Sequence, residues 1–130
     1  MKNKKDIKRF VKEQLKCECP DEVFESIEYE KDVEIEGLKV RDKVKVGGKL
    51  LVYVVDEEDL DYMLDEIPRL LAAGKSERDV SGLNKFRFVL LSDKILEMSQ
   101  VLVSVQIDSG SNMDENMFVH MVSKQSAIKH

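Results

Sequence analysis

The sequence predicts an α/β domain, with an α+β arrangement as the alternative, in which helices pack on one mixed β-sheet. Two apolar runs, LLVYVV at 50–55 and FRFVLL at 86–91, have the composition of buried strands. An amphipathic helical pattern separates these runs, and an alternating pattern precedes them. A chain of 130 residues buries about two-thirds of its unfolded surface on folding, so we expect residues 1–130 to form a single domain.

The first expected element is an N-terminal helix over 4–16. Four apolar residues recur there at helical spacing, which places them on one stripe against the core: Ile7, Phe10, Val11 and Leu15. Pro20 suits the first position of a short helical turn over 20–26, for which Cys19 would be the N-cap.

The chain then alternates between apolar and polar residues, as expected for an antiparallel strand pair with one wet face. The apolar positions of the first strand are Ile27, Tyr29, Val33 and Ile35, and those of the second are Leu38, Val40, Val44 and Val46. Gly37 separates the two strands, and Gly47 with Gly48 predicts a tight turn into the apolar run at 50–55.

The apolar run at 50–55 is expected to be the central strand, because its apolar residues are not limited to one face. The helix after it begins with acidic residues and is expected to end at Gly74, with a kink at Pro68. Residues 74–84 have no apolar period and predict a loop before the strand at 86–91. A strand, a helix and a second strand in this order predict a right-handed βαβ crossover.

Two later segments complete the expected order of helix, strand pair, strand, helix, strand, helix and strand. Residues 93–107 fit both a helical face and an alternating strand, and we favour the helix. The segment MFVHMVS at 117–123 predicts the last strand, followed by a frayed tail that ends at His130.

Charge and hydropathy exclude several classes of protein. The chain has 26 acidic and 21 basic residues, and this net charge of -5 disfavours a general nucleic-acid binder, which needs a surplus of Lys and Arg on one face. No apolar run approaches the about 18 residues of a membrane span, so no membrane association is expected. Charged residues interrupt the region that would have to be apolar in a secretory signal peptide, so we expect a cytoplasmic protein.

The stretch LKCECPDEVF contains both cysteines of the chain, Cys17 and Cys19. Two thiolates at this spacing could supply half of a tetrahedral zinc site or of an iron–sulfur site, which a homodimer would complete. The dipole of a following helix would favour a Cys19 thiolate and thiol exchange, whereas Glu18, Asp21 and Glu22 oppose a further negative charge. In the alternative interpretation both cysteines only pack at a helix junction.

Other charged residues are weaker candidates. Asp56 ends the central strand, where open α/β sheets place their ligands, although ordinary helix capping explains the acids at 56–59. A locally basic patch around the predicted loop is a candidate site for a phosphate or a carboxylate, and it consists of Lys75, Arg78, Lys85 and Arg87. His120 falls within the apolar alternation of the last strand and is interpreted as a structural histidine.

No short motif of known chemistry supports an enzyme. The sequence contains neither a GxxxxGK phosphate loop nor a GxGxxG or GxSxG motif. The leading functional hypothesis is therefore a small metal-binding or thiol-exchange protein that uses Cys17 and Cys19. The alternative is a non-enzymatic protein-interaction module with packed cysteines, and a homodimer or a protein partner is the expected mode of association.

Overall fold

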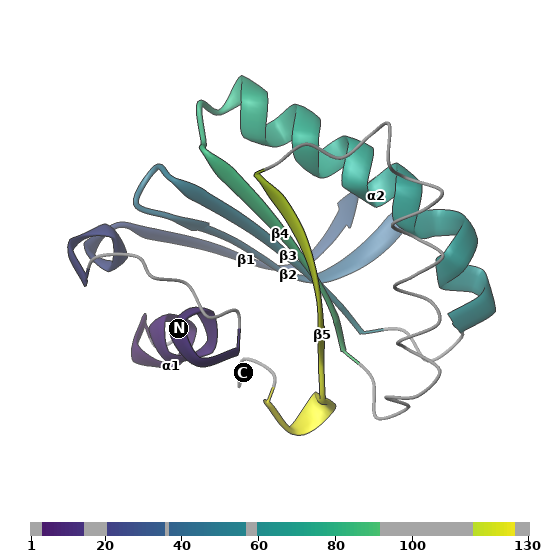
Figure 1. The fold of residues 1–130 in the computed structure, drawn as a ribbon, viewed down its shortest axis with the longest axis horizontal. Helices are drawn as coiled ribbons and strands as arrows, with labels where there is room; N and C mark the ends of the chain where they lie inside the picture. The colour runs from purple at the N-terminus through teal and green to yellow at the C-terminus, as the bar shows by residue number, and fades with distance from the viewer. Residues whose placement is uncertain (1–3, 15–20, 36, 57–59, 92–115, 127–130) are drawn as a thin grey trace.

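The computed structural model contains one five-stranded mixed sheet with helices on both of its faces (Figure 1). The structure describes residues 4–14, 21–35, 37–56, 60–91 and 116–126. The five strands are β1 (Ile27–Ile35), β2 (Leu38–Val46), β3 (Leu50–Asp56), β4 (Lys85–Leu91) and β5 (Met117–Val122). The helical elements are α1 (Lys4–Arg9), the π-helical turn η1 (Phe10–Gln14), the 3-10 turn η2 (Asp21–Glu25), the long helix α2 (Leu60–Val80) and the 3-10 turn η3 (Lys124–Ser126).

The strands lie in the sheet in the order in which they occur in the chain, β1-β2-β3-β4-β5. The first three pair antiparallel, and β3, β4 and β5 pair parallel, so the sheet is mixed as predicted. The crossover from β3 through α2 to β4 is the predicted βαβ unit. The helix expected over 93–107 lies outside the described residues.

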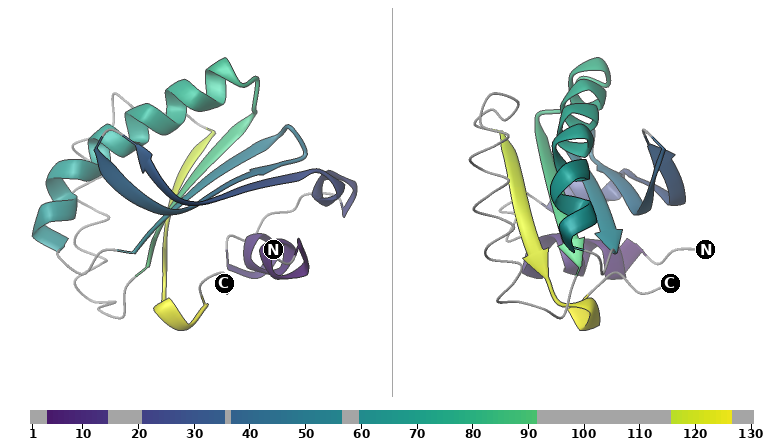
Figure 2. Two further views of the ribbon diagram at one scale, coloured as in Figure 1. Left: turned by 180° about the vertical axis from the view of Figure 1, so that it is seen from behind. Right: turned by 90° about the vertical axis from the view of Figure 1, so that its right-hand side faces the viewer.

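Helices cover both faces of the sheet (Figure 2). A layer of apolar side chains packs between the sheet and the helices on each face. On one face, Ile67, Leu70 and Leu71 of α2 pack on the odd-numbered residues of β3 and the even-numbered residues of β4. On the other face, α1 and η1 pack on the even-numbered residues of β3 and the odd-numbered residues of β4. Every residue from Leu50 to Val55 is buried, which confirms that β3 is a central strand with no wet face.

The β1–β2 hairpin curves through both layers. Leu38 and Val40 belong to the α2 layer, whereas Val44 and Val46 belong to the α1 layer, although alternate residues of a flat strand would all share one face. Two-stranded ribbons twist more strongly than wide sheets, and this hairpin twists enough to exchange its faces. Asp32 has a positive φ of 53°, a conformation that Asp tolerates better than most residues, at the middle of β1.

The prediction that the long helix ends at Gly74 is wrong, because α2 continues to Val80. Gly74 is a buried helical residue packed against the ring of Phe86, so its lack of a side chain serves close packing. The glycine that caps the C-terminus of the helix is instead Gly82, which lies two residues beyond Val80 and has a φ of 71°. The amide of Leu83 donates to the carbonyl of Arg78 at 2.9 Å and the amide of Gly82 to that of Asp79 at 3.3 Å, which is the Schellman pattern.

Candidate functional site: the outer edge of β5 and the polar clusters of the sheet

The two edge strands of the sheet differ in charge. β1 carries five charged residues among nine, namely Glu28, Glu30, Lys31, Asp32 and Glu34. β5, with the sequence MFVHMV, carries no Lys, Arg, Asp, Glu or Pro. Charged side chains on an edge strand discourage pairing with another chain, so β1 is protected in a way that β5 is not.

The backbone of β5 presents alternate residues to β4 and to its outer edge. The amide of Phe86 donates to the carbonyl of Asn116 at 3.0 Å, so Asn116 directs its backbone groups toward β4. In a strand this direction alternates, so Phe118 and His120 also bond to β4. The amide and carbonyl groups of Met117, Val119 and Met121 therefore point outward. Among the described strands, none pairs with this outer edge, which lies opposite the β1 edge in Figure 2.

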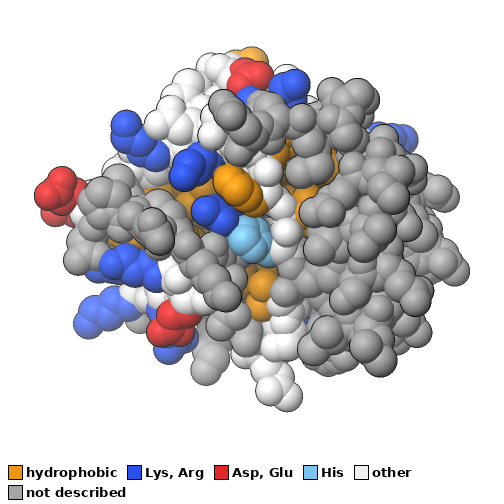
Figure 3. All heavy atoms as spheres, in the orientation of Figure 1, with side chains coloured by type: hydrophobic (Ala, Val, Ile, Leu, Met, Phe, Trp, Pro, Cys, Tyr) orange, Lys and Arg blue, Asp and Glu red, His pale blue; other side chains and the backbone are white. Residues whose placement is uncertain are grey.

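Beside this edge, Arg87, Phe118 and His120 form a cluster on the face of the sheet that carries α1. Arg87 is only 8 % exposed. Its guanidinium carbon lies 4.6 Å from the centroid of the Phe118 ring, and its Nη1 lies 2.8 Å from Nε2 of His120. Figure 3 shows a histidine side chain, in pale blue, with hydrophobic side chains and Lys or Arg side chains next to it.

His120 is uncharged at neutral pH. Burial and, to a smaller extent, the positive charge of Arg87 together lower the pKa of its imidazole from 6.5 to about 4. Because a guanidinium only donates hydrogen bonds, Nε2 of His120 accepts from Arg87 and the ring proton resides on Nδ1. The interpretation of His120 as a structural histidine agrees with this hydrogen bond and with its place in β5.

A second polar cluster joins α2 to the β1–β2 hairpin. The carboxylate of Glu77 accepts a hydrogen bond from the Tyr53 hydroxyl and forms ion pairs with Lys43 and, at 3.3 Å, with Lys45. Lys43 also lies 3.6 Å from Glu30. Burial alone would raise the pKa of Glu77, but the hydrogen bonds from Lys43, Tyr53 and Lys45 outweigh burial and lower it.

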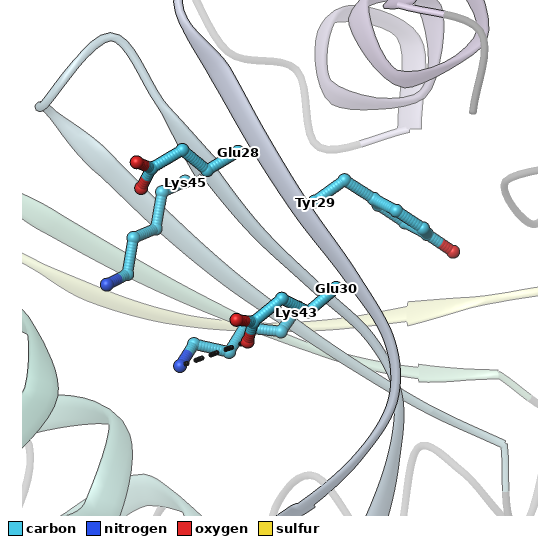
Figure 4. A pocket seen from close by; sticks show the side chains of 5 residues that line it. All are labelled: Glu28, Tyr29, Glu30, Lys43 and Lys45. Carbon is cyan, nitrogen blue, oxygen red and sulfur yellow. Dashed lines mark ion pairs between the residues drawn. The ribbon is translucent and has the colours of Figure 1, made fainter. Parts of the chain in front are cut away.

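A surface cavity of about 330 Å³ lies beside this second cluster and is lined by Glu28, Tyr29, Glu30, Lys43 and Lys45. In Figure 4 the four charged side chains lie on one side of the hairpin, whereas the Tyr29 ring points to the other side. The cavity is therefore lined by charged groups that neutralise one another across the strands. Small-molecule sites are mostly apolar, so the cavity does not have the lining of such a site.

Replacing Glu77 with glutamine is expected to destabilise the fold by about 1–2 kcal/mol, because two partly buried ammonium groups lose their shared carboxylate. Because the pKa of Glu77 is lowered in the folded state, its stabilisation of the fold is complete above the ordinary value of 4.5. The stabilisation is lost as the pH falls below 4.5 and through the lower pKa of the folded state. Urea unfolding at a series of pH values measures both effects. In the glutamine variant the loss of stability with falling pH should be smaller, and an unchanged pH profile would contradict this role of Glu77.

A third cluster surrounds Asp42, which is fully buried in the middle of β2. The Tyr29 hydroxyl donates a hydrogen bond to its Oδ1, and Arg41 Nη1 lies 2.5 Å from its Oδ2. Burial and the neighbouring Asp42 carboxylate raise the pKa of Tyr29, so its hydroxyl keeps its proton. The cluster has the character of a structural anchor between β1 and β2.

Most of the sequence-predicted site residues do not meet in one place. Cys17 and Cys19 lie outside the described residues, so their metal-binding or thiol-exchange role stays a prediction. Asp56 ends β3 as expected and lies 3.4 Å from Lys124 Nζ. Among the described residues, no three His, Cys, Asp or Glu side chains are grouped so that they could hold a metal ion.

The four residues of the candidate anion site are divided between elements. Lys75 and Arg78 belong to α2, and Arg78 is buried with its Nη2 2.9 Å from Asp79. Lys85 begins β4 and is exposed, whereas Arg87 lies on the face of the sheet opposite α2. That any of these residues binds an anion remains a prediction.

The Glu77 cluster was missed at the sequence level because the helix was expected to end before Glu77. Lys43 and Lys45 alternate with valines, and this pattern alone places them on one side of β2. No sequence pattern indicates that Glu77 reaches them, since that contact depends on how α2 crosses the sheet.

The fold is that of a mixed α+β protein, and of the two edge strands among the described residues one, β5, carries no Lys, Arg, Asp or Glu. Compared with known proteins, the chain matches no protein-family model, no curated protein and no solved structure. Within the described residues, no helix is both long enough and apolar enough to cross a membrane.

Proposed function

We propose that this protein is a non-enzymatic interaction module that binds a partner chain by strand addition along the outer edge of β5. The observation that carries the proposal is the contrast between the two edges of the sheet. β1 is protected by charged side chains, whereas β5 is uncharged and directs three residues' backbone groups away from β4. Edge strands of this kind are templates for a further strand.

The polar clusters of the described residues support an interaction role more than a catalytic one. Glu77 is bound by Tyr53 and two lysines, and the buried Asp42 is bound by Tyr29 and Arg41. Both carboxylates are held by side chains of neighbouring elements, so they join parts of the fold. The backbone groups of β5 supply the hydrogen bonds that strand addition uses, and its side chains supply contacts on both faces.

The test uses a synthetic strand of generic composition, namely alternating threonine and valine with two lysines at each end. We expect this peptide to slow amide hydrogen exchange at Val119, whose amide points outward. The amides of Phe118 and His120, which already bond to β4, should show no comparable change. The protein is kept dilute so that the peptide is the partner being measured.

Two variants of Val119 form a matched pair for this test. Val119→Pro removes the outward donor without removing a β4–β5 hydrogen bond, and proline is tolerated on edge strands at such positions. Val119→Ala shortens the side chain but keeps the amide. Binding should be lost in the proline variant and kept in the alanine variant. Equal binding by both variants, or no protection of the outward amide at any peptide concentration, would overturn the proposal.

A further inference from the structure

We infer that the strand added to β5 is β5 of a second copy of this chain, antiparallel to the first, about a two-fold axis through Val119. This inference rests on the proposed function. The carrying observation is that β5, the last of the described strands in the sheet, is nearly palindromic about Val119. Methionine stands at both ends of the pentapeptide Met117–Met121, and Phe118 and His120 stand on either side of the centre.

A two-fold interface demands that each contact occur twice, with the two partners exchanged. An antiparallel pair centred on Val119 places Val119 opposite Val119 and Met117 opposite Met121. It also places Phe118 of each copy opposite His120 of the other. At every position of this pairing, a residue therefore lies opposite one of the same type, or an aromatic ring lies opposite another aromatic ring. A strand whose sequence lacked this symmetry would place unlike residues opposite one another.

The same register uses all the outward backbone groups. Met117, Val119 and Met121 each have an outward amide and an outward carbonyl. With Val119 on the axis, these are the residues that form the closely spaced hydrogen-bonded pairs of an antiparallel ladder. Three residues with two groups each give about six hydrogen bonds between the copies. If the two strands were shifted by two residues relative to this register, one of the three outward residues of each copy would have no outward residue of the other copy opposite it.

Side chains on the α1 side of the strand fit this pairing. Phe118 and His120 form the pairs that share no hydrogen bond, in which side chains come closest, at a Cβ separation of about 4.5–5.5 Å. Arg87 is stacked on Phe118 of its own copy and bonded to His120, which orients both rings. No charged side chain of either β5 strand enters the contact.

Net charge makes a separate prediction about salt. Each copy carries a formal charge of -5, so the two copies repel one another over a distance that added salt shortens. A dimer held by uncharged strands should therefore become tighter as the salt concentration rises. An interface held by ion pairs would become weaker.

The experiment measures the mass of the full chain by sedimentation equilibrium over a range of concentrations, for the unmodified protein, Val119→Pro and Val119→Ala. The unmodified protein should reach twice the mass of one chain. Val119→Pro should weaken the dimer about 25-fold or more, since it removes one donor from each copy and each contributes about fivefold. Val119→Ala should weaken it no more than about fivefold, because only a side-chain contact is lost.

Register is tested by mixing isotope-labelled and unlabelled protein and recording nuclear Overhauser effects between copies. Contacts between the Val119 methyl groups of the two copies, and between Phe118 of one and His120 of the other, are expected. A protein that stays monomeric at all concentrations, or a dimer equally stable in both Val119 variants, would overturn the inference. If a monomeric protein still protects its Val119 amide when the threonine–valine peptide is added, only the self-pairing fails and the proposed function stands.

Discussion

Replacing Asp42 with alanine is expected to destabilise the folded protein by about 3 kcal/mol. The reason is that the variant leaves the Arg41 guanidinium and the Tyr29 hydroxyl without the carboxylate that binds them in the middle of the sheet. Removing one partner of a buried ion pair costs more than the pair contributes, because the remaining charge stays desolvated. The side chain of Arg41 is 23 % exposed, so part of its solvation can be recovered and the lower end of the usual range applies.

Urea unfolding followed by circular dichroism measures this change, at one fixed protein concentration because association would also alter the midpoint. Tyr29→Phe serves as the control, since it removes one hydrogen-bond donor and leaves the ion pair in place. Its expected cost is about 1 kcal/mol. If Asp42→Ala were no more destabilising than Tyr29→Phe, the buried carboxylate would not be the anchor between β1 and β2.

The sequence of β2 contains a clue to this cluster. In LKVRDKVKV the even-numbered positions are Leu38, Val40, Asp42, Val44 and Val46, and the alternation correctly predicts the strand and its buried side. Asp42 is the polar residue within that apolar series. A carboxylate at such a position has to be hydrogen-bonded. Its partners were beyond prediction, because Tyr29 reaches it only through the register of β1 against β2.

The position of β5 at the edge of the sheet could not be predicted from the sequence, for a different reason. The apolar run of MFVHMV predicts a strand, and the structure confirms one over Met117–Val122. Whether a strand lies at the centre or at the edge of a sheet depends on the order of the strands, which local patterning does not encode. A strand without charges is expected in a sheet centre, where β3 and β4 lie. Only the position of β5 at the end of the sheet turns the same composition into a candidate binding surface.

Substitution of Gly74 by alanine is expected to destabilise the protein by about 2 kcal/mol, although alanine is the better helix former. A Cβ atom at this position would lie 2.2 to 2.6 Å from three atoms of the Phe86 ring. Phe86 is fully buried and packs edge-on against Tyr53, with a centroid distance of 4.9 Å, so its ring has no solvent-filled space to move into. The expected overpacking penalty exceeds the gain of about 1 kcal/mol in helix propensity.

A double-mutant cycle separates overpacking from other effects of the new methyl group. Phe86→Leu removes the ring atoms that the methyl group would meet, so Gly74→Ala should cost less in that background than in the unmodified protein. Ala72→Gly, on the exposed side of α2, measures the helix-propensity term alone and should cost about 1 kcal/mol. Additive costs for Gly74→Ala and Phe86→Leu would show that the ring does not limit residue 74. A clear coupling would show that this glycine, which in the sequence resembles a helix terminator, lets α2 approach β4 closely enough to carry Glu77 to the lysines of β2.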